Sequence, residues 1–475
     1  MASTFHVENF GCRAARADGE AIDDRLRAAG LSQRQPSTAD LVVVNTCSVT
    51  AEADRAARAF IRRARRLNPA AKIVVTGCYA QRAPQELACL DGVAAVVGNS
   101  HKALAPEIVL SLAGPASPAS VSPALVSVSS LLSAGAPAPT WADDRFAHSF
   151  LEEAQVVPGS QTRPNLKIQD GCGNRCTFCV IPSTRGPSKS LPHAVVLRQV
   201  EGFAAAGGNE LVLSGINLGR WGRELPAPPV ATGAGSAPRT LAALARRIFE
   251  QTPLPRLRLS SIEPMDWDAD LIGLMAEFGG RRLARHAHLP LQSGSDAVLR
   301  RMHRRYRPWH YAEKVEALVR AAGPELTLGA DVMAGFPGET DGEFEETMAL
   351  VRALPFGYLH LFPFSPRPAT PGWALHTERP VPLAVVEERM AAMRALAAEK
   401  SQTHRRRFVG RELEAITLRT PPELAARKRT AALTENFLPV VIDGWLPANR
   451  LLRLRVTGMN AAGTLEAAAL EARPV

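Results

Sequence analysis

The chain has 475 residues, 46% of them hydrophobic, and a formal net charge of +10. This length predicts two to four domains with ample core, and no stretch is long and apolar enough to cross a bilayer. The positive charge favours an anionic partner, with nucleic acid as the leading candidate. Seven cysteines without a signal-peptide pattern predict a reducing compartment, the cytoplasm, and metal ligation in place of disulfides.

Residues 1–113 alternate short β-branched runs with helical patterns. Strand patterns lie at 5–9, 41–45 and 72–76, and the Ala- and Arg-rich stretch 52–67 is helical. This alternation predicts an open parallel α/β sheet domain. Residues 114–154 are rich in Ala, Pro and Ser, and we expect a linker there because such a tract cannot bury a core.

Three cysteines of the first domain each follow one of these strand patterns. They are Cys12, Cys47 and Cys78. Because the carboxyl ends of parallel strands meet at one crevice, we expect the three thiols to converge. Three thiolates can hold three irons of a [4Fe–4S] cluster and leave the fourth iron open, so we predict such a cluster here. Cys89 lies inside a helical pattern, QELACL, and is predicted to be a small core residue.

A second cysteine trio stands on one short loop, IQDGCGNRCTFCVIPSTRG. Cys172, Cys176 and Cys179 form the pattern C-x3-C-x2-C. Electron-transfer clusters and structural zinc sites both use four ligands, so a three-cysteine loop fits neither. The alternative of scattered buried thiols is disfavoured, since free cysteines seldom cluster with glycines around them. The spacing is similar to that of radical S-adenosylmethionine (SAM) enzymes, in which the open iron binds the amino and carboxylate groups of SAM.

Residues 155–398 repeat strand and helix patterns. The strand candidates are 166–169, 210–214, 256–260, 287–290, 326–333 and 359–362. Six units are too few for a closed eightfold barrel, so we predict a partial (β/α)6 barrel with its site at the strand carboxyl ends. Residues 231–238 are predicted to form a flexible loop.

Four polar residues near these strand ends are candidates for binding SAM. Glu210 begins a strand, and its carboxylate would accept hydrogen bonds from an ammonium group. Ser261 and Glu263 follow the strand in RLSSIEP and suit ribose hydroxyls, and Gln292 follows the strand in HLPLQSG. For each residue alone, an ordinary strand-to-helix turn is an equally good interpretation. Together, at successive strands, they favour one lined site.

Residues 399–475 contain strand patterns at 437–442 and 451–456 and open with HRRRFVG. They predict a small antiparallel β barrel that is basic at its entrance. The basic stretches 299–307 and 404–407 would either grip phosphates or form solvated helix faces. Trp221 and Trp373 would either stack on a base or anchor loops and core.

Several motifs occur in a fixed order: NTCSVT, GCYAQ, IQDGCGNRCTFCVIPSTRG, RLSSIEP, HLPLQSG and DVMAGFPGET. With the two cysteine trios, they make the chain resemble the radical SAM methylthiotransferases. The resemblance implies two [4Fe–4S] clusters, an N-terminal α/β domain, a radical SAM barrel and a C-terminal TRAM domain, a β barrel that often binds RNA. GCYAQ, CTFCVIP, SSIEP and FPFSPR are most similar to the class that acts on threonylcarbamoyladenosine in tRNA.

The resemblance implies methylthiolation at C2 of the adenosine just 3′ of the anticodon. The cluster on the second trio would reduce SAM to methionine and a 5′-deoxyadenosyl radical. The cluster on the first trio would hold a sulfur species that a second SAM methylates. Expected partners are the tRNA anticodon loop, an electron donor and a sulfur donor of unknown identity, and no membrane. Isopentenyladenosine in tRNA or a ribosomal-protein aspartate remain alternative substrates.

Overall fold

The computed structural model describes residues 3–113, 137–146, 151, 163–226 and 238–472. The chain forms two compact units, each described by itself: residues 1–154 with 170–175 and 179–189, and residues 155–169, 176–178 and 190–475. Most of the predicted linker, 114–136, 147–150 and 152–154, and residues 231–237 of the predicted loop lie outside the described residues. Among the helices described, none has the length and apolar character needed to cross a membrane.

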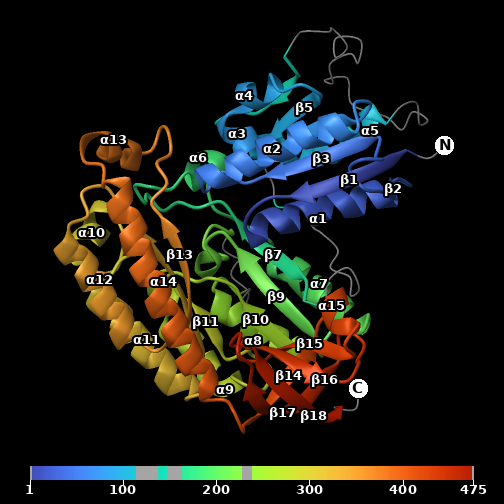
Figure 1. Ribbon diagram of the computed structural model, residues 1–475. Helices are drawn as coiled ribbons and strands as arrows, with labels where there is room; N and C mark the ends of the chain where they lie inside the picture. Colours follow the sequence, from blue (N-terminus) through green and yellow to red (C-terminus); the bar gives the residue numbers. More distant parts are fainter. Residues whose placement is uncertain (1–2, 114–136, 147–150, 152–162, 227–237, 473–475) are drawn as a thin grey trace. The chain divides into compact units, whose positions relative to one another are not determined.

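The first unit contains a six-stranded sheet in the order β2-β1-β3-β4-β5-β6, with every neighbouring pair parallel (Figure 1). Its strands are β1 (Thr4–Asn9), β2 (Ser32–Gln33), β3 (Leu41–Thr46), β4 (Lys72–Gly77), β5 (Val93–Gly98) and β6 (Thr140–Trp141). The predicted open parallel α/β sheet is confirmed. The sequence pattern missed β2, β5 and β6, and the edge strand β6 falls inside the segment predicted to be a linker.

Helices cover both faces of this sheet. The helices of this unit are α1 (Arg13–Ala28), α2 (Ala51–Leu67), α3 (Cys78–Arg82), α4 (Pro84–Ala88), α5 (Ala105–Leu112), α6 (Ile181–Arg185) and the 3-10 helix η1 (Asn99–Leu104). Side chains of α1 and α5 form one core with the sheet, and side chains of α2, α3 and α4 form the other. The prediction for Cys89 is wrong: it is exposed. It caps the C-terminus of the five-residue helix α4, which turns Leu87 and Ala88 inward instead.

The second unit contains two sheets that share the strand–helix repeat, β10-β9-β7-β8 and β11-β12-β13. Their strands are β7 (Asn165–Asp170), β8 (Lys189–Ser190), β9 (Glu210–Gly215), β10 (Arg256–Leu259), β11 (His286–His288), β12 (Thr327–Ala334) and β13 (Phe356–Pro363). Each of the six predicted strands overlaps one of these. The unpredicted strand β8 is only two residues long.

Helices follow the strands of this partial barrel. They are η3 (Leu218–Arg220), α7 (His193–Ala205), α8 (Leu241–Gln251), η4 (Pro264–Asp266), α9 (Ala269–Phe278), α10 (Asp296–Arg301), α11 (Pro308–Ala322), α12 (Asp341–Ala353), α13 (Pro371–Glu378) and α14 (Leu383–Arg406). Trp221 is fully buried, and its indole Nε1 donates to the Leu191 carbonyl at 3.0 Å. It is therefore a core anchor, whereas Trp373 on α13 is 44% exposed.

A closed barrel in the order β14-β15-β16-β18-β17 ends the chain. Its elements are β14 (Glu412–Thr417), α15 (Pro422–Ala425), β15 (Arg429–Thr434), β16 (Pro439–Asp443), β17 (Leu451–Met459) and β18 (Leu465–Ala472). The predicted small β barrel is confirmed, but it is not wholly antiparallel, because β16 pairs with β18 in parallel.

The basic segment 404–407 forms the end of α14, just before the first barrel strand. Helix α14 runs across the expected domain boundary at 398/399 and ends at Arg406. Arg405 and Arg407 donate to the carbonyl oxygens of Gly463 and Pro324, at 2.7 and 2.9 Å. Two of the three arginines of this segment thus donate to the protein's own backbone.

Candidate iron–sulfur and cofactor sites

The three N-terminal cysteines lie at the carboxyl ends of three adjacent strands. Cys12 follows β1 and caps α1, Cys47 directly follows β3, and Cys78 directly follows β4. Gly11 has φ +109°, and a Cβ built on it would lie only 2.4 Å from the Cβ of Cys47. A glycine is therefore needed to let the β1 loop approach Cys47. The sheet topology thus brings loops that are far apart in sequence to one edge of the sheet.

The electrostatic surroundings of these thiols suit a metal cluster. Cys47 and Cys78 are buried, and Cys12 is exposed. Burial raises the pKa of Cys47 to about 12, and neighbouring Cys78 and Cys12 raise it further in the same direction. Neighbouring thiols, two of them buried, need an added positive charge to ionise together, and bound metal supplies it. The residues therefore fit an iron–sulfur cluster, in which all three would be thiolates.

A buried ion network stands in the same unit. Lys102 Nζ lies 3.0 Å from carboxylate oxygens of both Asp18 and Asp170. Arg185 Nη1 lies 3.0 Å from Asp18 and 2.9 Å from Asp170. Asp170 and Arg185 flank the second cysteine loop, whereas Asp18 and Lys102 come from α1 and η1. The network therefore ties the ends of that loop to the N-terminal sheet.

The second trio lies on the loop after β7. Cys172, Cys176 and Cys179 are half-buried and form no disulfide. The Asn174 amide lies 3.4 Å from Cys172 Sγ, and Arg304 Nη1 lies 3.3 Å from Cys176 Sγ. Donors aimed at sulfur stabilise thiolates. These contacts fit cysteines that are ionised and bound to a cluster.

Three of the four predicted SAM residues lie just past strand carboxyl ends of the second unit. Ser261 Oγ is 2.6 Å from His288 Nδ1, which links the ends of β10 and β11. Gln292 pairs with β12 through its backbone, at 2.8 Å to the Asp331 carbonyl. Its side-chain Oε1 is buried without a hydrogen-bond partner among the described residues, so this group is available to a ligand.

Glu263 and Glu210 have different surroundings from those expected. Glu263 Oε2 accepts a hydrogen bond from Arg304 Nη2 at 2.6 Å. Glu210 begins β9, at the opposite end from the site, and is fully buried. Arg258 Nε donates to it at 2.8 Å, and Arg256 pairs with it at 3.5 Å. This placement corrects the proposed role of Glu210, because its carboxylate already neutralises buried arginines.

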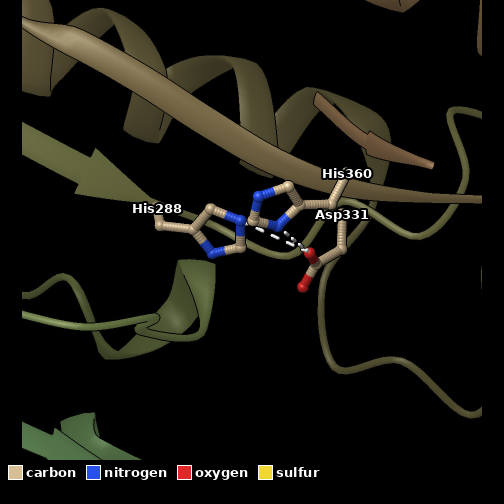
Figure 2. A group of neighbouring side chains, drawn as sticks. All are labelled: His288, Asp331 and His360. Carbon is tan, nitrogen blue, oxygen red and sulfur yellow. Dashed lines mark hydrogen bonds and ion pairs between the residues drawn. The ribbon is translucent and has the colours of Figure 1, made fainter. Parts of the chain in front are cut away.

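A further polar cluster lies on β11, β12 and β13 and is drawn in Figure 2. The Asp331 carboxylate lies 3.3 Å from His288 Nε2 and 3.3 Å from His360 Nδ1. The two histidines hold the pKa of Asp331 well below its usual range against the opposing effect of burial. In the described part of the chain, this is the group whose ligand atoms come within 4.8 Å of one another, close enough for a single ion. Neither cysteine trio has that spacing, and a cubane holds its thiolates farther apart than one ion does.

Comparison with known proteins agrees with this geometry. The "Radical SAM superfamily" model matches residues 166–351, and the "Uncharacterized protein family UPF0004" model matches residues 4–98. The chain is 31% identical to threonylcarbamoyladenosine tRNA methylthiotransferase MtaB of Rickettsia prowazekii, over 96% of this chain and 95% of that one. The same-named protein of Bacillus subtilis is 33% identical, over 93% and 91%. The chain belongs to the radical SAM methylthiotransferase family.

Another relative differs in its named substrate. The tRNA-2-methylthio-N(6)-dimethylallyladenosine synthase of Sorangium cellulosum is 35% identical, over 82% of this chain and 76% of its own. Among solved structures, a radical SAM methyltransferase, TsrM, from Kitasatospora setae has a TM-score of 0.50 at 16% identity, covering 78% of this chain and 77% of that one. That likeness concerns the fold. Membership of the family makes this methylthiotransferase an enzyme that uses a [4Fe–4S] cluster and SAM.

Sequence reasoning missed Arg304 of this methylthiotransferase. The basic stretch 299–307 predicted either a phosphate grip or a solvated face, yet Arg304 is buried against Cys176 and Glu263. The sequence patterns also did not identify His288 and Asp331, although His288 stands at a strand end in the motif HLPLQSG. That position was the available signal for His288.

Proposed function

We propose that this methylthiotransferase converts N6-threonylcarbamoyladenosine next to the anticodon of tRNA to its 2-methylthio derivative. It would use two [4Fe–4S] clusters, with SAM as radical source and methyl donor. Cys12, Cys47 and Cys78 would hold one cluster, and Cys172, Cys176 and Cys179 the other. The observation that carries the proposal is the presence of two separate cysteine trios, one at the sheet edge and one on the loop after β7.

The chemistry demands this equipment. C2 of adenine is an unactivated aromatic C–H position, which acid–base catalysis alone does not functionalise. A SAM-bound cluster supplies a 5′-deoxyadenosyl radical, while the protein supplies binding, orientation and exclusion of water. The unpartnered Gln292 Oε1 and the Ser261–His288 pair would line the SAM pocket. Glu263 would orient Arg304 against Cys176, one of the three ligands of the SAM-binding cluster.

The partners follow from the same proposal. The net charge of +10 suits the tRNA backbone, which dominates affinity in nucleic-acid binding. Two of the three relatives named above act, by name, on threonylcarbamoyladenosine in tRNA, and a tRNA substrate would place the enzyme in the cytoplasm. An electron donor and a sulfur donor are also required.

Nucleoside analysis of a strain that lacks this protein tests the substrate. The tRNA digest should lose 2-methylthio-N6-threonylcarbamoyladenosine and retain the unmodified threonylcarbamoyladenosine. Wild-type protein should restore the methylthio nucleoside, whereas Cys47→Ala and Cys176→Ala variants should not, and Cys89→Ala should. Loss of the methylthio derivative of dimethylallyladenosine instead would assign the substrate named for the Sorangium cellulosum relative. Loss of a methylthiolated aspartate from the ribosomal proteins of the same strain, measured by mass spectrometry, would assign a protein substrate.

A further inference from the structure

Arg185 is the most deeply buried cation near the N-terminal cysteine trio. It ends α6, and 1% of its side chain is exposed. Its Nη1 donates to Asp18 at 3.0 Å and to Asp170 at 2.9 Å. Lys102 contacts the same two carboxylates. Two cations thus face two anions, and the network is neutral as a whole.

The guanidinium has more donors than this network uses. It carries five N–H groups, two of them on Nη1. The remaining donors on Nε and Nη2 are buried and have no hydrogen-bond partner among the described residues. Leaving a buried charged donor unsatisfied is costly, because the group has lost its hydration and gained no acceptor. A bound ligand that accepts hydrogen bonds from these donors would remove this cost.

The end of helix α6, where Arg185 stands, lies beside the cysteine trio. Asn99 Nδ2 lies 3.4 Å from Cys78 Sγ and donates to the Thr184 carbonyl at 2.8 Å. The backbone next to Arg185 is therefore held beside Cys78.

We propose that Arg185 is an anion-binding residue of the N-terminal site, where its unused N–H groups hold an anionic sulfur ligand, a hydrosulfide or persulfide, at the open iron. This inference rests on the proposed function, because it needs the cluster on Cys12, Cys47 and Cys78. Each thiolate and the added sulfur anion contribute negative charge to a buried site, which is costly unless a cation pairs with it. The planar fork of arginine can engage two carboxylates on one nitrogen and a sulfur anion on the others, which the single ammonium of lysine cannot do.

The test uses full-length protein in which Cys172, Cys176 and Cys179 are all replaced by Ala, so that the N-terminal cluster alone contributes to the spectrum. Sodium sulfide is titrated anaerobically, and binding is followed by the change in the electron paramagnetic resonance spectrum of the reduced cluster. In this background, Arg185→Gln should weaken sulfide binding roughly tenfold or more. It should also shift the cluster's reduction potential to more negative values, because a positive charge that favours the reduced state is lost.

A compensated variant separates anion binding from folding. Arg185→Gln alone leaves Lys102 facing two carboxylates, whereas Arg185→Gln with Asp18→Asn restores a neutral pair of Lys102 and Asp170. The double variant should retain iron and still bind sulfide weakly, and Asp18→Asn alone should bind it about as tightly as the parent. Recovery of parental affinity in the double variant would show that Arg185 acts only through the ion network and would overturn the proposal.

Two other outcomes have distinct meanings. Loss of iron in both Arg185 variants, with iron retained in Asp18→Asn, would assign Arg185 to cluster assembly and would also overturn the proposal. The parent of this series is the protein in which only Cys172, Cys176 and Cys179 are replaced. If that protein takes up no iron or no sulfide, the proposed two-cluster function fails, and the inference about Arg185 fails with it.

Discussion

The guanidinium of Arg304 donates from Nη1 to Sγ of Cys176 across 3.3 Å. Only 4% of this side chain is exposed. Its Nη2 contacts Glu263 at 2.6 Å, and its Nε contacts Tyr306 at 3.2 Å. A buried cation is therefore fixed against one cysteine of the second trio, and a carboxylate and a phenol set its direction.

Replacing Arg304 by Gln should make the cluster on the second trio harder to reduce. A charge-assisted hydrogen bond of about 1.5–3 kcal/mol to a thiolate favours the more negative, reduced cluster. The midpoint potential should shift to more negative values, and reductive SAM cleavage should slow by roughly tenfold. A redox titration in a Cys47→Ala background, where the other cluster is disabled, measures the shift.

Arg305→Gln is the matched control, because Arg305 is the next residue and 45% of its side chain is exposed. In the Arg305→Gln variant, the midpoint potential of the cluster and the rate of reductive SAM cleavage should stay at the parental values. Equal shifts in the two variants would mean that the general positive charge of this stretch acts, and not the contact with Cys176.

The position of the N-terminal cysteines at strand ends could be predicted from the sequence, because it depends on local rules. A β-branched run followed by Cys and a helical pattern places the thiol at a strand end, and parallel topology brings such ends together. The same rules located the strands that precede Ser261 and Gln292. Glu210 was misassigned because a residue at the start of a strand lies at the opposite edge of the sheet.

Arg304 could not be identified from the sequence, because the direction of its side chain depends on the turn that follows a helix. Helix α10 ends at Arg301, and the chain then turns through His303, which has φ +54°. That turn sends Arg304 inward while Arg300 and Arg305 remain substantially exposed. In a run with four arginines around it, charge alone does not distinguish the buried one. The Arg185 network was equally hidden, because its four members are far apart in sequence.

Iron content should divide between the two cysteine trios. Anaerobically reconstituted protein should bind about eight irons, the sum of two cubanes. Replacing Cys172, Cys176 and Cys179 together by Ala should leave about half of that iron, because the cysteines of the N-terminal trio stand at other strand ends and are unchanged. Cys89→Ala should change nothing, since Cys89 is exposed on α4. Complete loss of iron, or none, in the triple variant would contradict the two-cluster assignment.

His404 should make the stability of the protein depend on pH. It is buried on α14 and shares a hydrogen bond with Thr327 at 2.9 Å. Burial lowers its pKa to about 4, so the unfolded chain binds a proton more readily than the folded one between about pH 6.5 and 4. Stability is therefore full above this window and falls as pH falls through it.

The expected loss from His404 is about 2 kcal/mol between pH 7 and pH 5. Urea unfolding of the cluster-free protein, followed by circular dichroism, measures it. A His404→Gln variant should be less stable at pH 7 but should lose less stability on acidification. An identical pH dependence in the variant would assign the effect to other groups.

Trp445 on the C-terminal barrel should contribute to tRNA binding. It lies between β16 and β17 and is 64% exposed. The loop around it is fixed on both sides: Thr430 Oγ1 donates to the Gly444 carbonyl and accepts from the Leu446 amide, each at 2.8 Å. A rigidly presented, exposed indole is suited to stack on an unpaired RNA base, which contributes about 1–3 kcal/mol per base. Trp445→Ala should therefore weaken tRNA binding roughly tenfold and leave the thermal unfolding midpoint and SAM cleavage unchanged.

Trp309→Ala, which removes a 51% exposed indole from α11, is the control and should bind tRNA as the wild-type protein does. Equal weakening in both variants, or in neither, measured by tRNA affinity at fixed salt, would contradict a base-stacking role for Trp445.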